Sequence, residues 1–265
     1  MPRIGIPRAL LYYQYYPLWS AFFQGMGLEV VLSEPTSKAI MAAGSLRVVA
    51  ETCLPVKVYC GHVTDLIGKC DYIFIPAIRS IQKNVYNCSK FLGLPDLIKA
   101  VIPRCPTIID VDIDASKGKV GLHPSTYDIG RWIQPKPKGQ KEAAQHAWQV
   151  HLDYQETLKT RGITPIEYLV HDQGNYDSHH CERSGAISTP LRDCSGLQPR
   201  NDIARNPCGG IPGDRDYAPP TQTPTHLTIA VIGHPYNIYD DFITHRILYR
   251  LNSLGARVVT PEIAG

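Results

Sequence analysis

Short apolar runs alternate with helical patterns along the first part of the chain. Four such runs lie at residues 3–7, 28–32, 71–76 and 107–111. Runs of this length and composition are typical of strands buried on both faces of a parallel sheet. Because helical patterns separate them, the sequence predicts an α/β fold with a doubly wound, mostly parallel sheet.

Prolines mark where several of the intervening helices begin. Proline is tolerated in the first turn of a helix, so Pro55 and Pro95 each predict a helix start. Pro17 lies within the first helical stripe and leaves the start of that helix open. This stripe, at three- and four-residue steps, consists of Leu11, Tyr15, Leu18, Phe22 and Met26.

A second, shorter α/β pattern lies near the end of the chain. Two short, mostly apolar runs, at residues 231–235 and 255–259, resemble the runs at residues 4–7 and 27–31. The two runs of each pair are separated by the same number of residues. This similarity reflects either an internal repeat or the general likeness of any two β-α-β units. We therefore predict a partial second β-α-β unit, which either adds to the first sheet or belongs to an architecture longer than this chain. Its helix has an Asp240 or Asp241 cap and an apolar stripe of Ile243, Ile247, Leu251 and Leu254.

These patterns divide the chain into four parts. The first α/β domain takes residues 1–128, a basic turn and helix take 129–170, and the partial second unit takes 226–265. Residues 171–225 are rich in Pro, Gly, Asp and Arg and hold few large apolar side chains. Such a segment cannot bury enough apolar surface to offset its ordering entropy, so we expect a disordered insertion or linker there.

Composition narrows the classes of protein to consider. The 265 residues are 43% hydrophobic and 19% charged, with a net charge of +3 and no long Lys/Arg run, so nucleic-acid binding gains no support. No stretch reaches the roughly 20 apolar residues that span a bilayer, and the N-terminus lacks the zones of a signal peptide. We expect a cytoplasmic protein without membrane contact. Its eight cysteines are then reduced thiols, metal ligands or redox groups.

Two cysteines precede predicted helix starts. Cys53 lies two residues before Pro55, and Cys88 lies upstream of Pro95. Free N–H groups at a helix N-terminus stabilise a thiolate and any anionic cluster that it binds, and Lys57 adds positive charge. The spacing alone does not separate a ligand pair from two inert buried cysteines.

The other cysteines favour plainer interpretations. Cys60, Cys70 and Cys105 are interpreted as structural, since burial is the usual state of a cysteine beside strands and helices. Residues 179–181 (His-His-Cys), with Cys194 and Cys208, are either a zinc site or a solvated stretch.

A few polar residues near strand and helix ends are also candidates. His62 and His234 are either ligand-crevice residues or capping and packing histidines. His234 follows a predicted strand, and ligands of open α/β sheets bind beyond the carboxyl ends of strands. The alternating residues Asp110, Asp112 and Asp114 form either an acidic site or, as we expect, solvated turns.

Several motifs taken together resemble one family. They are Ile-Gly-Ile-Pro-Arg-Ala-Leu at 4–10, Cys-Leu-Pro-Val-Lys at 53–57, Cys-Ser-Lys-Phe-Leu-Gly-Leu-Pro-Asp at 88–96 and Ile-Gly-His-Pro-Tyr-Asn-Ile-Tyr-Asp at 232–240. In this order they resemble the acyl-CoA dehydratase activase-related proteins, which are relatives of the 2-hydroxyacyl-CoA dehydratase iron–sulfur subunits. The resemblance covers residues 1–128 and 226–265.

The resemblance implies a [4Fe–4S]-type cluster and one-electron transfer in an acyl-CoA dehydration system. Cys53 and Cys88 match two of the family's cluster positions, and His234 and Lys57 would line a ligand crevice. The family's third cysteine lies beyond the 232–240 motif and is absent from this chain, which looks C-terminally shortened. The implied partners are an ATP-dependent activase or a complementary dehydratase-like subunit, with an acyl-CoA as substrate.

The resemblance does not decide whether the chain itself is catalytic. It has no phosphate-binding Gly-x-x-x-x-Gly-Lys-Ser/Thr motif, so the ATPase step is not expected here. The alternative function is a non-catalytic scaffold or interaction module that keeps the fold without a working cluster.

Overall fold

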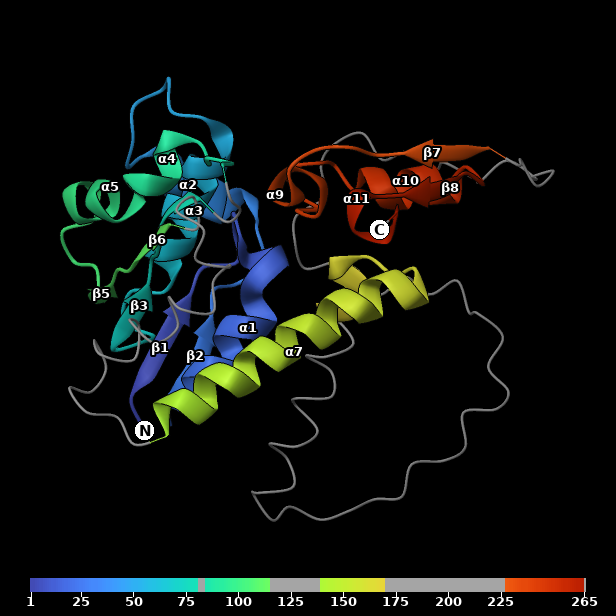
Figure 1. Cartoon of the computed structure of the whole chain (residues 1–265). Coiled ribbons are helices and arrows are strands. Elements are labelled where there is room, and N and C mark those ends of the chain that lie inside the picture. The colour runs from blue at the N-terminus through green and yellow to red at the C-terminus, as the bar shows by residue number, and fades with distance from the viewer. Residues whose placement is uncertain (81–83, 115–138, 170–226, 265) are drawn as a thin grey trace, which may run out of the picture.

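The computed structural model of the protein describes residues 1–80, 84–114, 139–169 and 227–264 (Figure 1). The predicted insertion at 171–225 and the cysteines and histidines within it lie outside the described residues. In chain order the elements are β1 (Arg3–Ile6), α1 (Tyr12–Gly25), β2 (Glu29–Leu32), α2 (Lys38–Ser45), α3 (Leu54–Asp65), β3 (Tyr72–Phe74), β4 (Ala77–Ser80), α4 (Ser89–Leu92), α5 (Leu94–Val101), β5 (Thr107–Ile109), β6 (Asp112–Asp114), α7 (Gln140–Arg161), β7 (Thr228–Ala230), α9 (Pro235–Ile238), α10 (Ile247–Ser253), β8 (Arg257–Val259) and α11 (Pro261–Ala264).

The main sheet confirms the predicted α/β class. Its strands are all parallel and lie in the order β2-β1-β3-β5, so each of the four predicted runs contributes one strand. Ile4 pairs with Val30 on one side and with Tyr72 on the other, which places β1 inside the sheet. The chain therefore crosses from β2 over β1 to β3. The strand order reverses at β1, and in open α/β sheets a ligand crevice lies outside the carboxyl ends of the strands at such a point.

A short strand pair that we did not predict extends this sheet. The N–H of Ile75 bonds the carbonyl of Ile109 (3.1 Å), and β4 then pairs with β6 in parallel. Asp112 and Asp114 lie in β6, so the expectation of solvated turns is wrong for both. Each carboxylate reaches the Arg79 guanidinium, at 3.7 and 3.5 Å, because parallel pairing sets β6 beside β4.

Aromatic side chains of α1 fill the core between this helix and the sheet. Trp19 and Phe23 each meet the ring of Phe74 edge-on, with centroids 5.0 and 5.1 Å apart. Helix α1 begins at Tyr12 and continues through Pro17, which answers the question that the sequence left open. The predicted helix of the 129–170 region is α7, and it lies along α1 on the outer face of the first unit (Figure 1).

Helices α2 and α3 touch backbone to backbone. A Cβ added at Gly44 would lie 1.8 Å from the Lys57 carbonyl oxygen, and one added at Gly61 would lie 2.1 Å from that of Ile40. Only glycine allows this approach. The contact holds the first half of α3, and with it the segment that carries Cys53.

The second unit forms a sheet of its own and does not join the first. β7 and β8 pair in parallel, with Thr228 opposite Arg257. The predicted helix is shorter than expected, because His245 and Arg246 adopt left-handed backbone angles (φ 52° and 59°) and α10 starts only after them. Its apolar stripe reaches the core only in part: Ile243 packs against it, whereas Ile247 is 42% exposed. The unit meets the first one through α9, which contacts α1, and through α11, which contacts α7 (Figure 1).

Candidate functional site

The two predicted ligand cysteines are both the N-cap residues of helices. Cys53 caps α3 and Cys88 caps α4, and both side chains are exposed. The Cys53 carbonyl accepts the N–H groups of Val56 and Lys57 (3.2 Å each), and Pro55 has no N–H. The first turn of α3 therefore offers fewer free N–H groups to an anion than the sequence led us to expect, although its positive dipole end remains.

The position of Cys88 is set by the strand pair that extends the sheet. The N–H of Asn87 bonds the carbonyl of Arg79 in β4 (2.8 Å), and the hydroxyl of Ser80 donates to the carbonyl of Val85 (2.5 Å). These bonds hold the segment just before Cys88 against β4. Helix α4 is one turn long and was not predicted; α5, which contains Pro95, follows it directly.

Both cysteines and His234 lie near the side chain of Tyr236 in α9. Burial raises the pKa of the Tyr236 hydroxyl above its ordinary value, and the negative charges of Cys88 and Cys53 raise it further. Both sulfurs therefore lie within electrostatic reach of one phenol. His234, the exposed N-cap of α9, stacks on the same ring with centroids 5.1 Å apart, and Phe91 of α4 contacts it at 5.9 Å.

The start of α4 contacts Tyr236 of α9, and the start of α3 lies within electrostatic reach of it; we call this region the cysteine site. Within the described ranges, no three His, Cys, Asp or Glu side chains are close enough together to hold a metal ion. Two thiols alone supply half of the four cysteines that a [4Fe–4S] cluster usually takes. Lys57 is not aimed at the pair, since its amine donates to the Ala50 carbonyl (2.7 Å) and holds the loop before Cys53.

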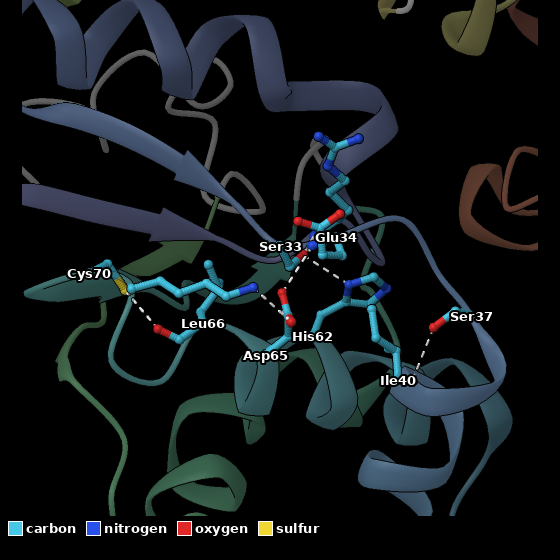
Figure 2. Close-up of polar contacts among 10 residues, drawn as sticks. Ser33, Glu34, Ser37, Ile40, His62, Asp65, Leu66 and Cys70 are labelled. Atoms are coloured by element: carbon cyan, nitrogen blue, oxygen red, sulfur yellow. Dashed lines mark hydrogen bonds and ion pairs between the residues drawn. The ribbon is translucent and has the colours of Figure 1, made fainter. Parts of the chain in front are cut away.

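Three further cysteines have the structural role that the sequence indicated. Cys60 is fully buried, and the Cys70 thiol, 8% exposed, donates to the Leu66 carbonyl at 3.5 Å (Figure 2). Burial raises the pKa of Cys60 and of Cys105 to about 11, so both thiols stay protonated and inert.

A buried chain of hydrogen bonds, which sequence reasoning missed, joins the two units beside this site. The Thr36 hydroxyl donates its only proton to Asp240, so Thr36 Oγ1 accepts from His62 Nε2 and the neutral ring accepts at Nδ1. The Ser33 hydroxyl therefore donates to His62 Nδ1 (2.8 Å; Figure 2), and Ser33 Oγ accepts the Arg8 N–H (2.9 Å). His62 Nε2 then carries the proton and donates to Thr36 Oγ1 (2.9 Å), whose hydroxyl donates to Asp240 Oδ2 (2.5 Å). We call Ser33, His62, Thr36 and Asp240 the relay. All its bonds run in one direction.

Burial sets the ionisation of this relay. It lowers the pKa of His62 to about 4, a shift that nearby Arg8 reinforces and Asp65 opposes. The imidazole is therefore neutral at pH 7, as its two hydrogen bonds require. Burial raises the pKa of Asp240, while its bonds from Thr36 and from the N–H groups of Ile243 and Phe242 lower it. The sequence marked Asp240 as a helix cap and the end of the 232–240 motif, and His62 as either a ligand-crevice or a capping and packing histidine; it did not indicate a link between them.

A cavity of about 210 Å³ opens where the relay reaches the second unit. Arg8, which follows β1, and Thr36, which follows β2, lie on one side of it, and Tyr239 and Phe242 lie on the other. At the point of strand-order reversal, by contrast, apolar side chains fill the space beyond β1 and β3 and leave about 20 Å³. The larger opening at this sheet edge therefore lies between the two units.

Comparison with known proteins gives one match. Residues 3–263 match the family model described as the CoA enzyme activase uncharacterised domain (DUF2229). No curated protein and no solved structure matches the chain significantly. Among the described helices, none combines the length and the apolar character needed to cross a membrane.

Proposed function

Because the chain belongs to the CoA enzyme activase domain family, we propose that it is an iron–sulfur component that transfers single electrons in an acyl-CoA dehydration system. The observation that carries this proposal is the convergence of Cys53 and Cys88 at Tyr236. Both thiols are exposed and come from separate helix N-termini that are far apart in the sequence. Thiolates are the ligands that iron–sulfur clusters take.

The donor set fits one half of a [4Fe–4S]-type cluster. Cys53 and Cys88 would hold it, and the cluster would supply one-electron redox chemistry to the acyl-CoA reaction. The residues of the chain contribute aromatic surroundings: the ring of Tyr236 contacts Phe91 of α4, and His234 stacks on the same ring. The positive end of α3 favours the thiolate of Cys53.

The described residues hold no third donor within reach, so further ligands would have to come from outside this part of the chain. We propose that a complementary dehydratase-like subunit supplies them across the exposed side of the cysteine site. An ATP-dependent activase would deliver the electron, because the chain has no phosphate-binding glycine motif of its own.

Iron and acid-labile sulfide analysis tests this proposal. The protein is purified anaerobically, alone and together with its complementary subunit, beside Cys53→Ala and Cys88→Ala variants. We expect iron and sulfide in near-equal amounts in the complex and their loss in both variants. Cys105→Ala serves as the control, because that half-buried thiol is held protonated and should not affect the iron content. An iron-free complex with the subunit bound would overturn the proposal.

One observation favours the alternative of a scaffold or interaction module. Apolar side chains of the second unit remain outside any core, with Tyr249 of α10 63% exposed and Ile232 83% exposed. A module of this kind would bind the complementary subunit equally well after replacement of both cysteines and would never contain iron. The same purification therefore separates the two functions.

A further inference from the structure

Arg8 carries a charged group that the described part of the protein does not pair. Its Nε atom is buried and has no hydrogen-bond partner, and none of the ion pairs among the described residues includes its guanidinium. Its backbone is fixed, because its N–H donates to Ser33 Oγ at the start of the relay. An unpartnered buried donor of a cation is costly, so such a group in a folded protein calls for a specific explanation.

The Arg8 side chain lines the 210 Å³ cavity between the units. The residue follows β1 at the carboxyl edge of the main sheet, which is where open α/β sheets bind ligands. The cavity is smaller than the roughly 300–1,000 Å³ pockets of drug-sized ligands. It therefore suits a small molecule better than a nucleotide or a whole coenzyme.

The two carboxylates of the lining do not neutralise Arg8. Both oxygens of Asp240 are occupied, Oδ2 by the Thr36 hydroxyl and Oδ1 by two backbone N–H groups at 3.0 Å. Asp241 is exposed to solvent, where water satisfies its charge. The positive charge of Arg8 lowers the hydroxyl pKa of Tyr13, against the larger raising effects of burial and of Asp240.

The rest of the lining selects among anions. Tyr12, Tyr13, Ile166, Leu169 and Phe242 give the cavity mostly apolar walls. A phosphate dianion would need several donors and would be repelled by Asp240 and Asp241. A singly charged anion with an apolar body matches one guanidinium set among aromatic and aliphatic side chains.

We propose that this cavity binds a small organic monocarboxylate, with the carboxylate on the Arg8 guanidinium and the apolar body among Tyr13, Leu169 and Phe242. The ligand supplies the acceptor that Arg8 Nε lacks. Because residues of both units form the cavity walls, a bound acid contacts both units. It does so at the point where the hydrogen bonds of the relay already connect them. The proposal does not depend on a cluster at the cysteine site, and it holds for either function considered above.

Calorimetric titration of the full chain tests this site. The probes are butyrate, 4-methylpentanoate and benzoate, each beside its uncharged amide. We expect saturable binding of at least one acid and none of the amides. Arg8→Gln should weaken binding roughly tenfold to a hundredfold, since it removes a charged hydrogen bond, and Arg8→Lys should weaken it less. Arg47→Gln, on an exposed residue remote from the cavity, should leave the affinity unchanged.

A second variant keeps the test decisive if Arg8→Gln fails to fold. Asp241→Asn removes an exposed negative charge from the rim, so it should fold and tighten acid binding by up to about fivefold. Three results would each refute the site: no saturable binding of any acid by the wild-type protein, equal binding of acids and amides, or an affinity that neither Arg8 nor Asp241 substitution changes.

Discussion

The hydroxyl of Tyr154 in α7 donates a 2.7 Å hydrogen bond to the backbone carbonyl oxygen of Tyr13 in α1. Within a helix that carbonyl would accept the N–H of the residue four positions later, which is Pro17 and has no N–H. The phenol of α7 therefore replaces the missing donor. This explains how α1 continues through an interior proline and why a tyrosine with only 1% of its surface exposed lies on α7.

Replacing Tyr154 with phenylalanine should leave the Tyr13 carbonyl without a partner. We expect a loss of about 1–3 kcal/mol in the free energy of unfolding, measured by urea titration. In a Pro17→Ala background the new N–H serves that carbonyl, so the same substitution should cost clearly less. Tyr249→Phe, on an exposed ring, is the matched control and should be near neutral. Equal costs in both backgrounds would show that the hydroxyl does not compensate for the proline.

The glycine contact between α2 and α3 should tolerate no side chain. Gly44→Ala places a Cβ 1.8 Å from the Lys57 carbonyl, so the helices must separate, and we expect a loss of about 3 kcal/mol. At Gly93 the nearest atom to an added Cβ lies 3.8 Å away, so Gly93→Ala should change stability by no more than about 1 kcal/mol. Urea unfolding of the two variants compares them directly. A Gly44→Ala protein as stable as Gly93→Ala would contradict the packing described.

Acid should destabilise the protein through His62. Its pKa is about 4 in the folded protein and 6.5 in the unfolded chain, so the unfolded state binds more protons between these values. Stability is therefore fully present above pH 6.5 and falls as the pH drops towards 4, by up to about 3 kcal/mol. Unfolding free energies of wild type and His62→Gln across this range measure the difference.

The pH comparison has two internal checks. His151 is also buried, with its pKa lowered to about 4, so a His151→Gln variant should remove a separate part of the same slope. Asp240, whose pKa is raised, gives a slope of opposite sign and is present in both proteins, so it offsets part of the slope in each. Parallel pH curves for wild type and His62→Gln would mean that the imidazole is not buried in a neutral form.

Thiol labelling should divide the cysteines into two groups. Cys53 and Cys88 are exposed and should react quickly with iodoacetamide in the metal-free protein, whereas Cys60, with a pKa of about 11, should react only on unfolding. Peptide mapping by mass spectrometry after short exposure identifies each site. Rapid labelling of Cys60 would show that α3 does not pack as described.

The titration of Tyr236 should report on the cysteine pair. Removal of both thiolate charges in a Cys53→Ala/Cys88→Ala protein should lower the pKa of this hydroxyl towards its ordinary value, while its burial keeps part of the shift. The tyrosine Cζ chemical shift, assigned by comparison with Tyr236→Phe, follows the titration. A Tyr236 pKa that does not respond to the double substitution would show that the two cysteines do not lie near α9.

Much of this protein is decided by local sequence. The four buried strands, the helix starts after Cys53 and before Pro95, and the parallel α/β class follow from apolar periodicity and from proline, which act over a few residues. The motifs at 53–57 and 88–96 likewise pointed to the right family and to cysteines that cap helices.

Only the tertiary structure decided how these parts meet. Thr36 and Asp240 are 204 residues apart, and no local pattern encodes their hydrogen bond or the burial that keeps His62 neutral. The failed predictions differ from local expectation in the same way: Asp112 and Asp114 form a strand because β4 is beside them, and α10 starts late because His245 and Arg246 turn the backbone before it. Local periodicity says which face of an element is apolar, whereas the partner of that face is fixed by the packing of the whole chain.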